Sequence, residues 1–405
     1  MTIDALTRPT PASPTRLIAV AGLSLTLAYV VVLVSVIFAG HWLVNGDGQP
    51  IASDFVNVWA AGQLTADGHP ALAYDWTVHK SMEVRAVGHA FDGYYGWHYP
   101  PTFLFVATAL ALLPILPATA IWLAITLPAY LVTVRNIFGE RAGYLLALGF
   151  PATLWNVTAT QNGFLTATLI GGTLSLLERQ PVAAGVCLGL LSYKPHFGLL
   201  FPIALVAARQ WRALIAASAT TLVMIALSWL AFGTDTWIAF FAATPKMTEA
   251  VMAQGLAEFS RLQSVFGFVR TQGGSFKFAW IVQIVTIVAC MTTVFALWRS
   301  RRVPYELKAA GLAALTLIAT PYLYIYDLAI LAVAVAFLLR YALRHGLLTA
   351  EVAGLALMTG LLLAYPYVQT QVGLGATLIV CALIAWRVRT HQLSVLSAAP
   401  EPLSY

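Results

Sequence analysis

Residues 54–62 read Asp-Phe-Val-Asn-Val-Trp-Ala-Ala-Gly and lie inside a polar segment, residues 41–100, of a chain that is otherwise almost entirely apolar. Of the 405 residues, 60% are hydrophobic and only 9% are charged, whereas a soluble globular domain carries about 25% charged residues. Lipid must therefore solvate most of this chain. Backbone in lipid has to satisfy its own hydrogen bonds, and the short alternating segments of a barrel are missing from the sequence. We predict an all-α polytopic membrane protein.

The polar segment follows the first apolar run, residues 17–39, and contains six acidic residues against two basic ones. This balance favours a location outside the cytoplasm. Apolar spacing within the segment predicts interfacial helices over residues 54–66 and 76–89, with a turn at residues 67–70 between them. We therefore interpret residues 41–100 as a folded extracytoplasmic loop.

Basic residues mark alternate junctions between the later apolar runs, and the positive-inside rule places these junctions in the cytoplasm. They are Arg135, Arg141, Arg179, Arg209, Arg212, Arg299, Arg301, Arg302, Arg340, Arg344, Arg387 and Arg389. At ~1.5 Å per residue, the run 101–138 is too long for one straight crossing, and we expect Pro114 and Pro117 to break it. Counting junctions predicts about 12 spans with both termini in the cytoplasm.

The resulting domain plan has one membrane domain between two tails. Residues 1–16 form a disordered cytoplasmic tail, residues 17–388 the single membrane domain, and residues 389–405 a second cytoplasmic tail. A second extracytoplasmic loop covers residues 233–276. Several spans are short and interrupted by Pro or Gly, so we expect neighbouring helices to bury them or a cavity to adjoin them.

The strongly polar, non-basic motifs all fall on the predicted extracytoplasmic face. Asp54 is a candidate general base, although its residue type alone favours an ordinary loop carboxylate or the N-cap of the following helix. Asp75 is a second candidate carboxylate, and its position favours a cap of the helix that follows it. Lys194 could hold a phosphate or snorkel to the interface, and His196, two residues on, could contact phosphate or sugar or be structural. Asp327 follows a tyrosine cluster that suits either sugar recognition or an interfacial aromatic belt.

The remaining candidates are weaker signals. Gln161 and Asn162 form a turn, and His98 and Tyr99 precede the prolines that begin the next membrane segment. Arg261 and Arg270 in the second loop could close over a phosphate or be solvated. Metal-ligand spacing, a P-loop and a dinucleotide fingerprint are all missing from the sequence, so we expect no metal or cofactor. The net charge of +6 needs no nucleic-acid partner, because the cations lie at span ends.

Taken in order, these motifs resemble glycosyltransferase family 87, the polyprenyl-phosphate-mannose-dependent mannosyltransferases with a GT-C fold. The resemblance rests on Asp54-Phe55 with Trp59-Ala60-Ala61-Gly62, Tyr99-Pro100-Pro101, Gln161-Asn162-Gly163, Tyr193-Lys194-Pro195-His196, and Tyr322 with Tyr326-Asp327-Leu328. It implies a GT-C-type helix bundle and metal-free, inverting transfer of a hexose, by default mannose, from a polyprenyl-phosphate donor to a hydroxyl of a lipid or glycan acceptor. The reaction would take place on the extracytoplasmic side of the plasma (inner) membrane.

The residue roles are hypotheses built on this resemblance and on the chemistry of sugar transfer. Asp54 is the base. The donor phosphate meets Lys194, His196, Arg261 and Arg270. The sugar and acceptor contacts come from Asp75, His98, Tyr99, Gln161, Asn162, Tyr322, Tyr324 and Asp327.

Two other classes of protein compete with this interpretation. A transporter or flippase of a lipid-linked saccharide also needs many spans and intramembrane polar groups, but it often shows internal repeats, and we find none that is convincing. A structural membrane subunit would leave the polar residues of one face without a shared purpose. Convergence of Asp54, Lys194 and Asp327 on one cavity near the outer face would favour transfer, whereas a central cavity open to both faces would favour transport.

Overall fold

The computed structural model describes residues 13–93 and 95–397, where it forms 18 α-helices, α2 to α19, joined by short 3₁₀ and π-helical turns. These ranges contain no β-strand, only isolated bridges near Trp42. The all-α prediction is therefore confirmed. Residues 1–12 and 398–405 of the predicted tails lie outside the described residues. Residues 14–16 belong to α2 and residues 389–397 to α19, so these parts of the predicted tails are helical.

Six segments in the described chain are long and apolar enough to cross a bilayer. They are α2 (Pro14–Phe38), α6 (Ile115–Phe138), α12 (Trp211–Phe232), α15 (Phe276–Arg299), α17 (Ala329–His345) with the preceding turn η7 (Ile325–Leu328), and α19 (Val372–Ser397). The protein is thus a multi-pass membrane protein. The higher number of about 12 spans stays a prediction, because the other apolar helices are shorter.

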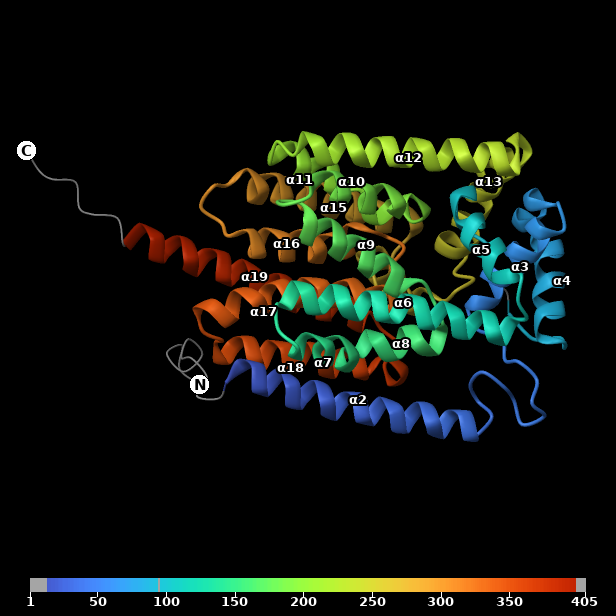
Figure 1. Cartoon of the computed structure of the whole chain (residues 1–405), viewed down its shortest axis with the longest axis horizontal. Coiled ribbons are helices and arrows are strands. Elements are labelled where there is room, and N and C mark those ends of the chain that lie inside the picture. Colours follow the sequence, from blue (N-terminus) through green and yellow to red (C-terminus); the bar gives the residue numbers. More distant parts are fainter. Residues whose placement is uncertain (1–12, 94, 398–405) are drawn as a thin grey trace, which may run out of the picture.

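Helix α17 forms the centre of the bundle. Almost all of its residues are buried, against α6, α9 (Gly163–Leu176) and α16 (Tyr305–Ala319). A helix that is apolar on every side is expected in such a position. Helices α2 and α12, by contrast, expose most of their apolar side chains, and they lie along opposite edges of the molecule with α17 between them (Figure 1).

Prolines and glycines interrupt several apolar runs, as predicted. Pro114 separates α5 (Leu104–Ala111) from α6, whereas Pro117 is accommodated in the first turn of α6. Pro151 begins α8 (Pro151–Ala159) directly after α7 (Ala142–Gly149). Between α10 (Pro181–Leu190) and α11 (Phe201–Ala207), two 3₁₀ turns, η3 (Leu191–Tyr193) and η4 (Pro195–Gly198), replace regular helix. These breaks let polar side chains enter the bundle.

The polar segment folds against one end of the bundle. Its two predicted helices form, as α3 (Phe55–Ala66) and α4 (Trp76–Val87), and they gather with α5 and α13 at the end of the molecule away from the first turn of α2 (Figure 1). Helix α3 is covered by protein along most of its length. A Cβ on Gly62 would lie 2.1 Å from the carbonyl oxygen of Ala107, so this glycine lets the backbone of α5 pack directly on α3.

The predicted second loop, residues 233–276, is largely helical. It contains α13 (Thr234–Thr248), the π-helical turn η5 (Glu249–Ala253), η6 (Phe259–Arg261) and α14 (Val265–Thr271). Charged residues and Pro245 indicate a loop in the sequence, but α13 accommodates Pro245 in its interior. Aromatic packing holds the helix in place, because Phe240 contacts Tyr74 of the polar segment with ring centroids 5.8 Å apart. Helix α18 (Thr349–Leu363) completes the bundle beside α19.

Candidate functional site

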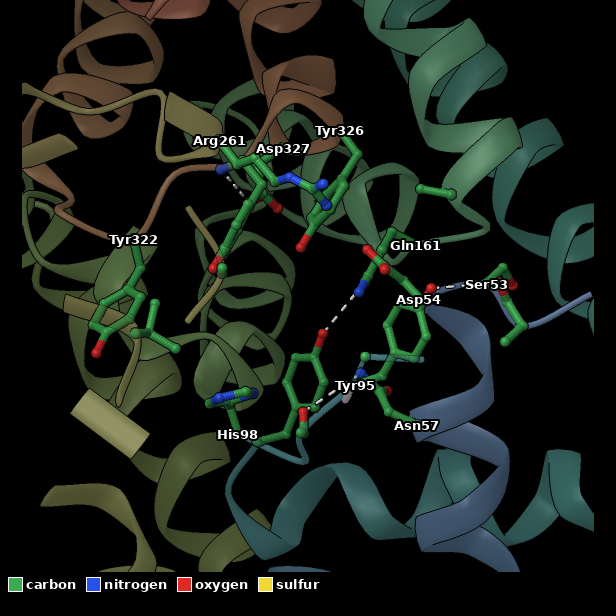
Figure 2. Close-up of a pocket in the computed structure, with 18 of the residues that line it drawn as sticks. Ser53, Asp54, Asn57, Tyr95, His98, Gln161, Arg261, Tyr322, Tyr326 and Asp327 are labelled. Atoms are coloured by element: carbon green, nitrogen blue, oxygen red, sulfur yellow. Dashed lines mark hydrogen bonds between the residues drawn. The ribbon is translucent and has the colours of Figure 1, made fainter. Parts of the chain in front are cut away.

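A cavity of about 1020 Å³ adjoins α3 and α13 and is lined by residues from segments far apart in the sequence. All but three of the predicted site residues line it. They are Asp54, His98, Tyr99, Gln161, Lys194, His196, Arg261, Tyr322, Tyr324 and Asp327. Figure 2 shows Asp54 and Gln161 on one wall, with Arg261, Tyr326 and Asp327 on another. Asp54, Lys194 and Asp327 therefore converge on one cavity, and the position of this cavity near the outer face stays a prediction.

Asp54 occupies the N-cap position of α3, yet its side chain makes no capping hydrogen bond. The carboxylate instead lines the cavity, where burial raises its pKa to about 6. A hydrogen bond with Gln161 and the charges of Arg261 and Lys194 oppose this rise. A carboxylate with a raised pKa and no structural partner at the helix end has the properties of a general base.

Asp75, the second candidate carboxylate, does not line the cavity. It caps α4, where one of its oxygens accepts hydrogen bonds from the backbone N–H groups of Thr77 and Val78, both at 3.0 Å. The sequence allowed each aspartate to be either a helix cap or a catalytic carboxylate, and the structure gives the two residues different positions. Asp75 is the structural cap and Asp54 faces the open space.

Lys194 forms a buried ion pair with Asp327. The Lys194 Nζ atom lies 2.6 Å from Asp327 Oδ1, and the two side chains are 7% and 2% exposed. Asp327 Oδ2 also accepts a hydrogen bond from the backbone N–H of Tyr324, and the ammonium group lies 5.5 Å from the centre of the Tyr326 ring. This lysine does not snorkel toward the bundle surface. A carboxylate already compensates its charge inside the cavity wall.

Arg261 is the cation in the cavity wall with the weakest attachment. Its only ion pair in the described chain is with Glu258, at 3.5 Å, and both side chains are more than half exposed. Exposed pairs of this kind contribute roughly 0–1 kcal/mol, so the guanidinium group can exchange Glu258 for another anion at little cost. The positive charge of Arg261 partly offsets the rise in the pKa of Asp54 that burial causes.

A rigid turn after α8 supports the wall opposite Arg261. The Tyr99 hydroxyl donates a hydrogen bond to Gln161 Oε1 at 3.3 Å and accepts one from Asn162 Nδ2 at 2.7 Å. Asn162 is buried behind the wall and does not line the cavity. A Cβ on Gly163 would lie 2.3 Å from the carbonyl oxygen of Tyr326. This glycine therefore lets η7, which carries Asp327, pack directly against the turn.

Arg270 is the third predicted residue that lies away from the cavity. Its guanidinium group donates hydrogen bonds to the carbonyl oxygens of Gly274 and Ala253, each at 2.8 Å, and it stacks on the Phe259 ring at 4.3 Å. These contacts hold the turns around α14 together. Asp75, Asn162 and Arg270 are thus structural in this fold, and we do not carry them into the functional proposal.

The cavity wall also contains aromatic residues to which the sequence assigned no role in the site. Tyr95 and Tyr326 lie in its wall (Figure 2), and Trp155 and Tyr365 line it with their ring centroids 5.8 Å apart. The aromatic cluster before Asp327 was a usable signal for Tyr326. Trp155 and Tyr365 belong to apolar runs in which a membrane-facing aromatic residue looks the same as a cavity-facing one.

Comparison with known proteins places this site in context. Residues 97–321, more than half of the chain, match the family model of glycosyltransferase family 87. No curated protein and no solved structure matches the chain, so the GT-C-type architecture stays a prediction. The matched residues include Gln161, Lys194 and Arg261. Asp54 and Asp327 lie on either side of the match, so the roles of these two carboxylates rest on the geometry described above.

Proposed function

This chain belongs to glycosyltransferase family 87, and from that premise we propose that it transfers a hexose, by default mannose, from a polyprenyl-phosphate donor to a hydroxyl of a lipid or glycan acceptor. That it is a multi-pass membrane glycosyltransferase follows from the family and from its six long apolar helices. Family membership favours transfer over the transporter and structural-subunit interpretations. The observation that carries the proposal further is the uncapped Asp54 carboxylate facing Arg261 and Lys194 across one cavity.

The lining of the cavity supports an amphiphilic donor. One part carries the carboxylates and cations, and α13, η5 and the turn after them add apolar side chains, which lie among two threonines and Glu258. The apolar residues are Phe240, Met247, Val251 and Leu256. A phosphate attached to a long hydrocarbon needs both kinds of surface, because its head group seeks charge and its tail seeks apolar contact.

In the proposed reaction, Asp54 accepts the proton of the acceptor hydroxyl as the hydroxyl oxygen attacks the anomeric carbon. The new carbon–oxygen bond forms while the bond between that carbon and the phosphate oxygen breaks. Its electron pair leaves with the polyprenyl phosphate. A single displacement of this kind inverts the configuration of the anomeric carbon. The raised pKa of Asp54 makes it a better proton acceptor than an ordinary aspartate, while leaving it mostly ionised at pH 7.

The leaving phosphate gains negative charge in the transition state and needs cations close by. Arg261 is suited to this role because a guanidinium group binds phosphate with paired N–H donors and its contact with Glu258 is weak. Lys194 remains paired with Asp327, and this ion pair adds a fixed dipole beside the phosphate. His98, His196, Tyr99, Gln161, Tyr322 and Tyr324 complete the wall, and we propose that they contact the sugar, its phosphate and the acceptor.

The first experiment compares the wild-type protein with Asp54→Asn in transfer from radiolabelled polyprenyl-phosphate-mannose to a crude lipid extract. A missing general base lowers the rate by roughly 10²–10⁴-fold, so we expect Asp54→Asn to lose transfer by about this factor. Asp75→Asn is the matched control, because Asp75 is a carboxylate of the same segment that caps a helix. We expect it to retain transfer.

The outcomes separate the parts of the proposal. Equal transfer by wild type and Asp54→Asn would move the base to another group. Transfer by wild type only from other lipid-linked hexoses would replace mannose. If no polyprenyl-phosphate sugar served as a donor while another donor did, the donor class would be wrong although the glycosyltransferase family would stand.

A further inference from the structure

A second cavity, of about 500 Å³, lies between the turn joining α11 to α12 and the loop joining α15 to α16. Figure 1 shows both connections at the end of the bundle opposite α3 and α4, so this cavity is far from the candidate active site. Four of its lining residues are basic, namely Arg209, Arg299, Arg301 and Lys308. Glu178 is the one acidic residue among those that line it.

The arginines of this cavity differ from others near the same end of the bundle. Arg344 lies 2.6 Å from Glu306, and Arg387 makes a buried pair with Glu351 at 2.5 Å. Arg209, Arg299 and Arg301, by contrast, have no carboxylate within ion-pair distance among residues 13–93 and 95–397. The cavity therefore holds an excess of uncompensated positive charge, which favours an anionic ligand.

The walls of the cavity are held in place by hydrogen bonds and aromatic packing. Lys308 Nζ donates a hydrogen bond to the carbonyl oxygen of Ser300 at 2.5 Å, which fastens the α15–α16 loop to the start of α16. Trp298 packs edge-on against Tyr305 at 5.9 Å, and its buried Nε1–H has no partner in the described part of the chain. Arg209 has φ +57, a left-handed conformation that is unusual for a residue other than glycine.

Apolar side chains exposed around this cavity indicate that its mouth borders the lipid. Trp211, which begins α12 two residues after Arg209, is 52% exposed, and Val206 and Phe295 are 42% and 43% exposed. A tryptophan at the end of an apolar helix is typical of the depth at which lipid head groups lie. Basic pockets between helix ends at this depth suit anionic head groups.

We propose that this cavity binds the phosphate group of an anionic membrane lipid. Arginine guanidinium groups match a phosphate with several N–H donors each, and three of them line this space without an ion-pair partner in the described residues. Inorganic phosphate has the same recognition chemistry, but it would make no use of the apolar rim. The proposal does not depend on the donor or sugar of the transfer reaction.

Native mass spectrometry of the detergent-purified full-length protein tests this site. Phosphatidylglycerol is titrated as the anionic lipid, phosphatidylcholine as the zwitterionic one and inorganic phosphate as the free anion. We expect phosphatidylglycerol to bind more tightly than phosphatidylcholine. Affinity should fall about fivefold for each arginine removed in Arg301→Ala and in Arg299→Ala/Arg301→Ala. Arg302→Ala is the control, because Arg302 is exposed in the same loop but does not line the cavity.

Sugar transfer at wild-type rates by these variants would show that they fold. Equal binding of the two lipids would overturn the proposal, and so would phosphatidylglycerol binding that is unchanged in the double variant. An equal loss in Arg302→Ala would reduce the site to general surface charge and also overturn it. Saturable binding of inorganic phosphate without selective binding of phosphatidylglycerol would identify an anion site and overturn the assignment to a lipid.

Discussion

Asp54 and Asp75 show how similar residues acquire different roles. Each aspartate precedes a helix in the polar segment, and each could cap that helix. Asp75 does so, with two backbone N–H donors, whereas Asp54 leaves the end of α3 uncapped and lines the cavity. A capping interaction stabilises a helix by about 1 kcal/mol, and α3 lacks this contribution at Asp54. Local losses of stability of this kind are expected at functional sites.

The pH dependence of transfer should report the titration of Asp54. Its pKa is raised to about 6, and only the ionised carboxylate can accept a proton. We therefore expect kcat/KM to rise with pH through about 6 and to level off above it, with roughly a tenfold increase between pH 5 and pH 7. Because the charge of Arg261 lowers this pKa, Arg261→Gln should move the rise to higher pH. A rise that stays in place in Arg261→Gln would contradict the assignment.

The buried pair of Lys194 and Asp327 should dominate the stability of the cavity wall. Removing one partner leaves an uncompensated charge in a buried position, which costs about 3–5 kcal/mol. We expect Lys194→Met to lower the free energy of unfolding by about this amount, measured by denaturant unfolding in detergent micelles. Lys194→Met/Asp327→Leu should recover most of the loss, because an apolar pair of similar volume needs no compensation.

The exposed pair of Arg261 and Glu258 provides the control for this experiment. Arg261→Gln should change the unfolding free energy by less than about 1 kcal/mol. The alternative outcome is that the losses of unfolding free energy in Lys194→Met and Asp327→Leu add up in the double variant. Such additivity would mean that the two side chains do not stabilise each other and would contradict this prediction.

Several site residues lie at breaks between short helices. Lys194 lies between the 3₁₀ turns η3 and η4, Asp327 lies in η7, and Gln161 lies in the turn between α8 and α9. Side chains of this polarity are costly when they face lipid, and they almost always point to the bundle interior or to a water-filled cavity. The interruptions turn them toward one cavity, and neighbouring helices bury the breaks.

Gly163 tests whether this assembly depends on close backbone packing. The Cβ of Gly163→Ala would approach the Tyr326 carbonyl oxygen to 2.3 Å, and neither group belongs to a flexible side chain. We expect a loss of about 1–3 kcal/mol in unfolding free energy, together with reduced transfer, because η7 would shift relative to Gln161. Gly360→Ala in α18 meets no neighbouring atom within 4 Å and should not destabilise the protein. Similar results for both variants would show that the contact at Gly163 is unimportant.

Across the whole molecule, the polar cavity and the basic helix ends are segregated. Helix α2 begins and α19 ends at the same end of the bundle, and the candidate active site adjoins the opposite end, near α3 and α13 (Figure 1). Arg135 lies in the last turn of α6 and Arg299 in that of α15. Charge asymmetry of this kind underlies the positive-inside rule, and it supports our prediction that the cavity faces away from the cytoplasm.

Cysteine labelling of intact cells can measure this orientation. The three native cysteines, Cys187, Cys290 and Cys381, are unpaired and can be replaced. In that background, Asp67→Cys in the polar segment should react with a membrane-impermeant maleimide. Arg302→Cys should react only after the membrane is permeabilised, because it is exposed at the opposite end. The reverse pattern would place the candidate active site on the cytoplasmic side.

The amino-acid sequence alone was sufficient for the class of protein and for the position of α3 and α4, and ten of the thirteen residues it suggested for the site line the cavity. Composition and charge determine these features locally, since an apolar run must be helical in lipid and Pro and Gly mark its breaks. The sequence did not predict that residues 233–276 are mainly helical. Its charges and Pro245 are also compatible with a loop, and packing of Phe240 on Tyr74 is a tertiary contact.

The tertiary structure alone decided the partners of the polar residues. Lys194 and Asp327 are 133 positions apart, and nothing in either motif indicates that they neutralise each other. The division between Asp54 and Asp75 is likewise set by which carboxylate finds backbone donors and which finds open space. Trp155 and Tyr365 likewise face the cavity because of how their helices pack in the fold, which the residues next to them in the sequence do not reveal. Side-chain identity limits what a residue can do, whereas burial and neighbouring charges, which depend on contacts distant in the chain, select what it does.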